Sequence, residues 1–253
     1  MSLSGKVALI TGAGSGIGRA TALRLAAEGA AVAVMGRRRD RIESTADEVR
    51  RQGGEALPLL GDVSAESDAE ESLAQTETAF GGIDILFNNA GIAMDGNVLE
   101  TSPAAWRETL EINLTGPFLM SRAAVPCLRR RGGGVIINNA STLGLVGLQR
   151  AAAYCASKGG LVLLTRAMAL DHAADKIRVN AICPGVVDTA MPRRRGMDRA
   201  DSRQLDEAYG SLHPLGRIGT PEEVAALVAF LAGDDAAFIT GVAYPIDGGL
   251  TAL

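Results

Sequence analysis

Short apolar runs alternate with longer stretches of helical period, and this alternation constrains the fold more than any other feature of the chain. The runs "KVALIT", "AVAVM", "ALPLL" and "IDILFN" are separated by segments 17–28, 39–51 and 65–80, which have helical period. A strand that reaches the next strand through a helix lies parallel to it. The pattern predicts a mainly parallel sheet.

The same rhythm continues through a helical region at 103–131, the strand "GVIINN", a helix at 152–174 and the strand "IRVNAIC". A helix that opens with Thr220 as N-cap and Pro221 runs to about Ala232, and the strand "GVAYPID" follows. With no repeat and no linker, residues 1–253 predict a single domain. Its expected architecture is a doubly wound α/β fold, with helices on both faces of a seven-stranded sheet.

A polar segment at about 189–213 interrupts this rhythm and is too long for an ordinary connection. We expect either a lid over the substrate or a disordered segment. Its arginines Arg193, Arg194 and Arg195 would attract an anionic substrate or would simply be solvated. Four apolar residues after the strand "GVIINN" form either an apolar wall of the site or part of the core: Leu143, Leu145, Val146 and Leu148.

Charge and cysteine content exclude several classes of protein. A net charge of −4, with short and scattered arginine runs, argues against nucleic-acid binding. Three separated cysteines form neither a disulfide framework nor a metal-ligand cluster, which favours a cytoplasmic protein without a metal. The longest uncharged span, 132–149, contains Asn138, Asn139, Ser141 and Thr142, so no membrane segment is expected.

The glycine-rich stretch "TGAGSGIG" lies between the first strand and the first helix. Backbone N–H groups and the positive end of a helix dipole at such a turn suit a dinucleotide pyrophosphate. The glycines are Gly12, Gly16 and Gly18, a spacing that differs from G-x-G-x-x-G. A flexible turn without a ligand is the alternative, but the strand–turn–helix setting favours phosphate.

The end of the second predicted strand indicates which dinucleotide would bind. An NAD site usually has Asp or Glu there for the ribose hydroxyls, whereas this chain has Gly36, Arg37 and Arg38. A guanidinium binds a 2′-phosphate in a bidentate manner, so Arg37 favours NADP(H) over NAD(H). The alternative is that Arg37 belongs to a solvated helix start.

Tyr154 and Lys158 lie one turn apart on a predicted helix, in a chain with 3 lysines among its 25 basic residues. Tyrosine has a reference pKa near 10 and serves as an acid or base at neutral pH only beside positive charge. A compact ammonium at this position would meet a ribose and a phenol, which a broad guanidinium would not imitate. An ordinary surface pair is the alternative.

Ser141 follows the strand "GVIINN" by two residues, at the edge of the sheet where open α/β folds bind ligands. Its hydroxyl could donate to a substrate carbonyl. A serine in such a place also commonly caps a turn, and considered alone Ser141 fits that role better.

Together these motifs closely resemble the short-chain dehydrogenase/reductase family over nearly the whole chain. The resemblance rests on these stretches: "TGAGSGIG", "GDV", "NNAG", "EINLTG", "NNASTLG", "YCASK", "PGVVDT", "HPLGRIGTPEEVA" and "ITGVAYPIDGG". It implies a Rossmann-type oxidoreductase. Ser15 departs from the basic residue of many NADP-preferring members, and Ala140 replaces a commonly found serine.

The resemblance also implies roles for single residues. Tyr154 is the general acid/base, Ser141 polarises the carbonyl, Lys158 binds the ribose and lowers the pKa of the tyrosine, and Asn113 holds a water in a proton relay. The implied cofactor-binding residues are Gly12, Ser15, Gly16, Ile17, Gly18, Arg37, Asp62, Val63, Asn89, Ala90, Gly91, Tyr154, Lys158, Pro184, Val187 and Thr189. Asp62, considered alone, fits a helix cap better.

We therefore expect hydride transfer between NADP(H) and a ketone, an oxoacyl compound or a secondary alcohol. An NAD-dependent alcohol or sugar dehydrogenase is the first alternative, and a non-catalytic cofactor sensor is a remote one. The resemblance also implies a homotetramer formed through the two long helices and the last strand, although the sequence allows a dimer. The close pair Gly159 and Gly160 is expected to permit tight packing beside the site.

Overall fold

The computed structural model describes residues 3–193 and 201–252, and its centre is a seven-stranded sheet. The strands are β1 (Val7–Thr11), β2 (Ala31–Gly36), β3 (Ala56–Leu60), β4 (Ile85–Asn88), β5 (Gly134–Asn139), β6 (Ile177–Pro184) and β7 (Ala243–Ile246). They are ordered β3-β2-β1-β4-β5-β6-β7 and every neighbouring pair is parallel. The predicted doubly wound architecture is confirmed, and all the carboxyl ends of the strands lie at one edge.

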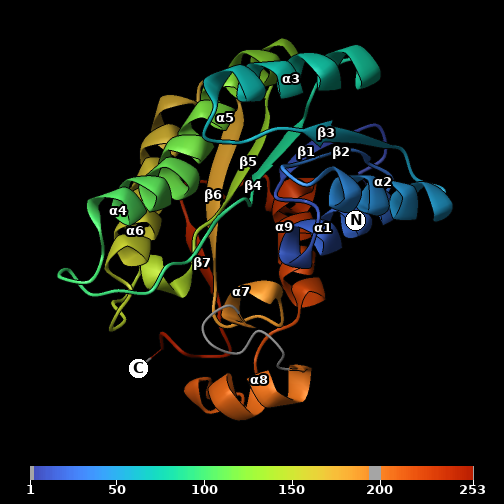
Figure 1. Cartoon of the computed structure of the whole chain (residues 1–253). Coiled ribbons are helices and arrows are strands. Elements are labelled where there is room, and N and C mark those ends of the chain that lie inside the picture. The colour runs from blue at the N-terminus through green and yellow to red at the C-terminus, as the bar shows by residue number, and fades with distance from the viewer. Residues whose placement is uncertain (1–2, 194–200, 253) are drawn as a thin grey trace.

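Helices cover both faces of the sheet (Figure 1). One face carries α1 (Gly16–Ala27), α2 (Arg39–Arg51) and α9 (Pro221–Ala232), and the other carries α3 (Glu66–Phe80), α5 (Gly116–Arg130) and α6 (Ala152–Asp171). Successive side chains of a strand point to opposite faces. Leu9 of β1 therefore packs with one helical layer and Ile10 with the other, and both are fully buried.

The region 103–131, expected to be one helix, is divided into three parts. α4 (Pro103–Leu110) and α5 are separated by a π-helical turn, Glu111–Thr115, in which the Gly116 N–H donates to the carbonyl of Glu111. Pro117 has no N–H for the carbonyl four residues before it, which is that of Asn113. The α-helical ladder is therefore interrupted at Asn113, and a π turn is often found at such functional positions.

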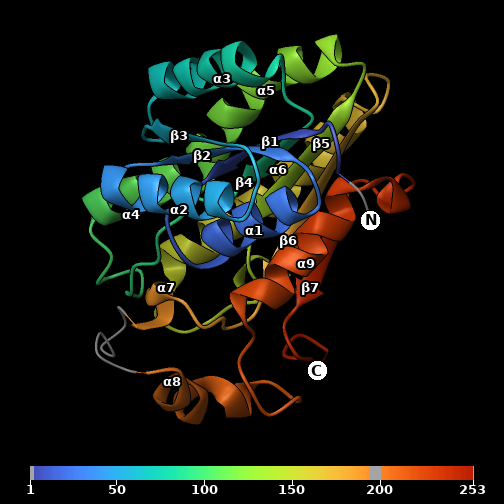
Figure 2. The same ribbon diagram turned by 90° about the vertical axis from the view of Figure 1, so that its right-hand side faces the viewer.

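The polar segment 189–213 is partly helical where the structure describes it. It contains α7 (Ala190–Arg193), α8 (Ser202–Tyr209) and a 3-10 turn, Gly210–Leu212, with residues 194–200 outside the described part. Arg194 and Arg195 lie outside it, as does the side chain of Arg193, so the role expected for these arginines stays a prediction. Both views place α7 and α8 beyond one end of the sheet (Figures 1 and 2).

Short one-turn elements complete the fold, at Thr142–Gly144 and Asp234–Ala236. The predicted start of α9 is confirmed, because Thr220 and Glu223 form a reciprocal capping box ahead of Pro221. Tight packing at the glycine pair is also confirmed at Gly160. A Cβ built there would lie 2.9 Å from the Leu114 side chain, so the glycine lets α6 approach the π turn closely.

Candidate active site

A cleft of about 610 Å³ follows the carboxyl edge of the sheet. Residues directly after β1, β2, β3, β4, β5 and β6 line it, because parallel strands end at the same edge. Of the residues predicted from the sequence, those that line the cleft are Gly12, Ser15, Gly16, Ile17, Arg37, Asp62, Val63, Asn89, Ala90, Gly91, Ser141, Tyr154, Lys158, Pro184, Val187 and Thr189. Gly18 and Asn113 lie behind its wall.

The glycine turn has the geometry that a phosphate requires. Gly12 and Gly16 have φ values of 63° and 52°, in the left-handed region that favours glycine. Ser15 is the N-cap of α1, but its side chain makes no capping hydrogen bond, so the first-turn N–H groups remain for an anion. Gly18 lets α1 pack closely against the glycine turn, because a Cβ at this position would lie 2.4 Å from the carbonyl oxygen of Gly12. The turn thus fits a dinucleotide.

Arginines gather at one end of the cleft. Arg37, Arg38 and Arg41 line it beside Asp62, and the Arg37 Nη1 lies 3.3 Å from the Asp62 Oδ2. Burial works to raise the pKa of the Asp62 carboxyl, but hydrogen bonds from Ser64 and the charge of Arg37 outweigh it and hold the pKa below its usual value. Asp62 lines the cleft and accepts the N–H and the hydroxyl of Ser64 in a turn. The N-cap of α3 is Ala65, so the helix-cap interpretation of Asp62 is wrong.

A network of partly buried side chains, which the sequence did not reveal, fixes the strand ends at the cleft. The Thr11 hydroxyl accepts the N–H groups of Asn89 and Ala90, at 2.9 and 3.0 Å. The Asn89 amide donates to the Thr11 carbonyl and accepts from the Asn139 side chain at 2.9 Å. Loops after β1, β4 and β5 are therefore held together, and the only signal in the sequence is polar residues at strand ends.

Lys158 is buried, with 4% of its surface exposed, on the face of α6 that meets the cleft. Its Nζ donates to the Asn139 carbonyl at 2.7 Å and lies 5.8 Å from the centroid of the Tyr154 ring. Burial lowers the pKa of this ammonium to about 8, because removal from water disfavours the charged form. The predicted juxtaposition of Tyr154 and Lys158 on one helical face is confirmed, and the alternative of a surface pair is wrong.

Tyr154 lies in the first turn of α6, and its neighbours fix that turn. A bridge joins Gly96 to Ala151, where the Gly96 N–H donates to the Arg150 carbonyl at 2.9 Å. Ser141 accepts the Leu143 N–H at 3.1 Å and so caps the turn that begins at Thr142. Ser141 is thus both a cap and a lining residue of the cleft.

Both polar atoms of the Asn113 side chain form hydrogen bonds within the protein. Its Oδ1 accepts the Ile92 N–H and its Nδ2 donates to the Ile92 carbonyl, each at 2.8 Å, and Nδ2 also donates to Ser157. A Cβ built on Gly91 would lie 3.2 Å from this Oδ1 and 3.5 Å from the Lys158 Nζ. The amide therefore positions the loop beside Lys158, and the relay role expected of Asn113 stays a prediction.

The other end of the cleft is apolar. Leu143, Val146 and Leu148 line it, and Leu145 does not. Val146 and Leu148 are 45% and 51% exposed, so the prediction that they form a wall of the cleft is confirmed, and the alternative that they belong to the core is wrong. Sequence reasoning missed four other lining residues, which come from separate segments that the fold brings together: Met191, Tyr209, Leu212 and Leu250.

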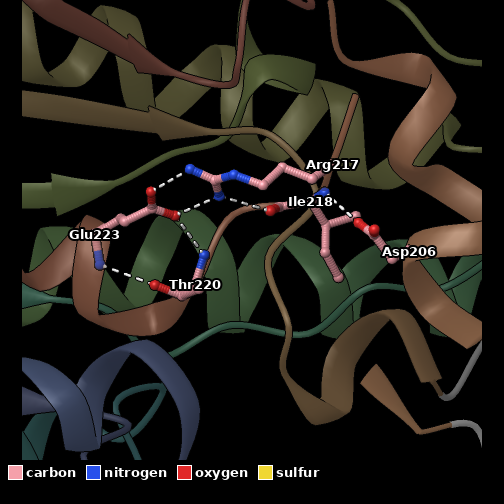
Figure 3. A network of polar contacts seen from close by, with 5 residues as sticks. All are labelled: Asp206, Arg217, Ile218, Thr220 and Glu223. Carbon is pink, nitrogen blue, oxygen red and sulfur yellow. Dashed lines mark hydrogen bonds and ion pairs between the residues drawn. The ribbon is translucent and has the colours of Figure 1, made fainter. Parts of the chain in front are cut away.

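A clasp, made of Asp206, Arg217, Ile218, Thr220 and Glu223, ties α8 to α9 (Figure 3). Arg217 binds both Glu223 carboxylate oxygens, at 2.6 and 3.0 Å, and this pairing lowers the pKa of Glu223 to about 2. Ile218 donates its N–H to the Asp206 Oδ1 at 2.8 Å. Next to the clasp, Gly219 exchanges two backbone hydrogen bonds with the segment 186–188, which follows β6.

The described residues hold no group of three or more metal-ligating side chains. Among the helices of residues 3–193 and 201–252, none is long and apolar enough to cross a membrane.

Comparison with known proteins identifies the family. Residues 12–251 match the family model described as enoyl-(acyl carrier protein) reductase. An uncharacterised oxidoreductase of Thermotoga maritima is 42% identical over 100% of both chains. Meso-2,3-butanediol dehydrogenase of Serratia marcescens is 41% identical, covering 100% of this chain and 97% of the relative, and cyclohexanol dehydrogenase of Acinetobacter sp. strain SE19 is 40% identical, covering 97% and 95%.

A crystal structure of a short-chain type dehydrogenase/reductase from Mycobacterium marinum superimposes with a TM-score of 0.93. It is 38% identical and is matched over 100% of this chain and 98% of its own. The remote alternative of a non-catalytic sensor is therefore not supported. The protein belongs to the short-chain dehydrogenase/reductase family and is an oxidoreductase that acts on CH–OH and C=O groups.

Proposed function

We propose that the protein transfers a hydride between NADP(H) and a ketone, an oxoacyl compound or a secondary alcohol. The observation that carries this proposal is one continuous cleft, with arginines at one end and the pair Tyr154 and Lys158 further along. The uncapped N-terminus of α1 suits the pyrophosphate between them. When bound, the nicotinamide supplies the hydride, which passes to or from the carbon that bears the substrate oxygen.

The residues of the chain supply one proton and an orientation. In reduction, Ser141 donates a hydrogen bond to the carbonyl oxygen, and Tyr154 gives its phenolic proton to that oxygen. The Lys158 ammonium stabilises the phenolate that remains. The proton is replaced from solvent through a water beside Asn113, and alcohol oxidation runs through the same groups in reverse.

The choice of NADP(H) is supported by the three arginines at the adenosine end. A 2′-phosphate placed there would meet Arg37, Arg38 and Arg41, and Arg37 keeps guanidinium nitrogens beyond the one that faces Asp62. The same ion pair supports an NAD-dependent alcohol or sugar dehydrogenase as second candidate. Asp62 compensates part of the charge of Arg37 and, as a carboxylate that lines the cleft, is of the residue type that accepts from ribose hydroxyls in NAD sites.

Initial rates with NADPH and NADH, measured on the wild type and on Arg37→Ala, test the cofactor. A hydrogen bond to a charged group contributes about 1.5–3 kcal/mol, so we expect kcat/KM for NADPH to fall about 10- to 100-fold. The rate with NADH should stay nearly unchanged. Arg39→Ala is the matched control, because Arg39 is exposed, pairs with Glu43 and does not line the cleft. Equal preference in wild type and Arg37→Ala contradicts the NADP assignment.

A homotetramer is part of the same proposal. Phe118, Leu163 and Leu170 on α5 and α6 are 46%, 63% and 82% exposed, and Phe238 before β7 is fully exposed. Apolar surface of this kind commonly marks contacts between subunits. Light scattering coupled to gel filtration should give four times the mass of the chain, whereas half that value would indicate the dimer.

A further inference from the structure

The lining of the substrate end of the cleft bears on which substrates the protein accepts, and this inference rests on the proposed function. Beyond Ser141 and Tyr154, the cleft is lined by side chains that are apolar or uncharged: Leu143, Val146, Leu148, Met191, Tyr209 and Leu212. They come from two segments, the loop after β5 and the helical stretch after β6. Both segments line the same cleft as Ser141 and Tyr154.

Four of these side chains are unusually exposed for their type. Val146, Leu148, Met191 and Leu212 are 45%, 51%, 36% and 49% exposed, although each lines the cleft. Large apolar side chains gathered at the mouth of a site indicate that the ligand itself covers them. Burying this rim against a hydrocarbon skeleton removes apolar surface from water on both partners.

Most of the charged side chains that line the described part of the cleft lie at the other end. Among the cleft residues that the structure describes, the charged side chains are Arg37, Arg38, Arg41, Asp62 and Lys158. The first four surround the adenosine end, and Lys158 is buried against the Asn139 carbonyl. A carboxylate or phosphate on the substrate skeleton would therefore lose water among apolar side chains without gaining a cation from these residues.

We propose that the substrates of this enzyme are uncharged, predominantly hydrocarbon ketones and secondary alcohols, and that the Val146, Leu148, Met191 and Leu212 rim selects them over anionic oxo acids. The rim accepts the hydrocarbon part. Ser141 and Tyr154 receive the single oxygen that reacts. The Tyr209 side chain is the one hydroxyl-bearing group that α8 adds to the wall.

Three ligands that share one ring isolate the effect of charge: cyclohexanone, 4-oxocyclohexanecarboxamide and 4-oxocyclohexanecarboxylate. Their binding to the full chain with NADP⁺ present is measured by ligand-observed NMR, and their reduction by NADPH is measured separately. Differences of about 1–3 kcal/mol in a pocket correspond to 10- to 200-fold. We expect the carboxylate to bind at least about tenfold more weakly than the amide of nearly the same size.

The variant Leu148→Arg places a cation on the rim without touching the reacting groups. It should reduce the preference for amide over carboxylate about tenfold, while NADPH binding stays unchanged. Leu99→Arg is the matched control, because Leu99 is 96% exposed and lies outside the cleft. If Leu148→Arg unfolds, Leu212→Lys on the facing segment makes the same test.

Binding and turnover separate the two proposals. Carboxylate binding equal to or tighter than amide binding overturns the substrate class, even if the carboxylate is reduced rapidly. Preferential binding of the neutral ligands without any NADPH oxidation supports the substrate class and contradicts the proposed reaction. An unchanged amide-to-carboxylate ratio in both arginine or lysine rim variants would show that the rim does not select.

Discussion

The two ends of the cleft are built in different ways. At the cofactor end, partly buried hydrogen bonds of Thr11, Asn89 and Asn139 join the ends of three strands, and the Lys158 ammonium donates to the end of β5. At the substrate end, half-exposed apolar side chains are carried by short segments outside the sheet. Side-chain hydrogen bonds thus fix the reacting groups, whereas substrate contacts depend on how α8 is attached.

α8 is attached at two places. Its Leu205 side chain is fully buried, and its Asp206 carboxylate accepts the Ile218 N–H, next to the Arg217–Glu223 pair (Figure 3). The same stretch exchanges backbone hydrogen bonds with 186–188, which carries the cleft-lining Val187. A change at the clasp should therefore affect substrate binding first, and a change below the strands should affect chemistry first.

The largest effect is expected from Tyr154→Phe at the cofactor end. Removing the phenolic hydroxyl removes the proton donor, and general acid catalysis contributes about 10²- to 10⁴-fold. We expect kcat to fall about a thousandfold while the Kd for NADPH, measured by fluorescence, changes little. Near-full turnover of the variant on any ketone that the wild type reduces would show that the proton comes from another group.

Lys158→Arg should lose about a hundredfold in kcat. The Nζ lies in a buried site, 2.7 Å from the Asn139 carbonyl and close to Gly91, and a broad planar guanidinium would not reproduce this compact contact. Steady-state rates and NADPH affinity measure the loss. Lys176→Arg is the matched control, because Lys176 lies in the turn before β6, outside the cleft. Full activity of Lys158→Arg would contradict this explanation of why the position is a lysine.

Much of the cofactor end could be predicted from the sequence because its signals are local. Strand and helix periods gave the sheet, and a spacing of four residues placed Tyr154 and Lys158 on one helical face. The π turn at Asn113 could not be foreseen from period alone. It depends on the missing N–H of Pro117, in a stretch whose apolar pattern is otherwise that of one continuous helix.

The substrate end was harder because its residues meet only through tertiary structure. Leu148, Met191, Tyr209, Leu212 and Leu250 lie on four segments, and nothing in their spacing relates them. The clasp was hidden for a similar reason. Arg217 and Glu223 are six residues apart, a spacing that no regular element brings together, whereas Thr220 and Glu223 three residues apart were readable as a helix start.

An intermediate effect is expected from Asp206→Ala at the clasp. It leaves the buried Ile218 N–H without an acceptor, a loss of about 1.5–3 kcal/mol for a bond to a charged group. We expect KM for the ketone to rise about tenfold and the KM for NADPH to stay within about twofold. Asp206→Asn, which keeps an oxygen acceptor, should recover most of the loss.

Glu207→Ala is the control for that variant, because Glu207 lies on the same helix and pairs with Arg203 on the surface. Its kinetic constants should match the wild type. Equal rises in both KM values for Asp206→Ala would mean that the clasp supports the whole cleft, and the contrast between the two ends would fail.

The smallest effect concerns pH at the cofactor end. Burial lowers the pKa of Lys158 to about 8, below its ordinary value of 10.5. The ammonium is therefore present below pH 8 and is lost above it, and NADPH affinity should fall a few-fold between about pH 7 and 9. Between the two pKa values the unfolded chain binds more protons, so this group makes the unfolding free energy rise with pH. Affinity and stability should change in opposite directions, and Lys158→Met should abolish both trends; parallel changes would show that another group titrates.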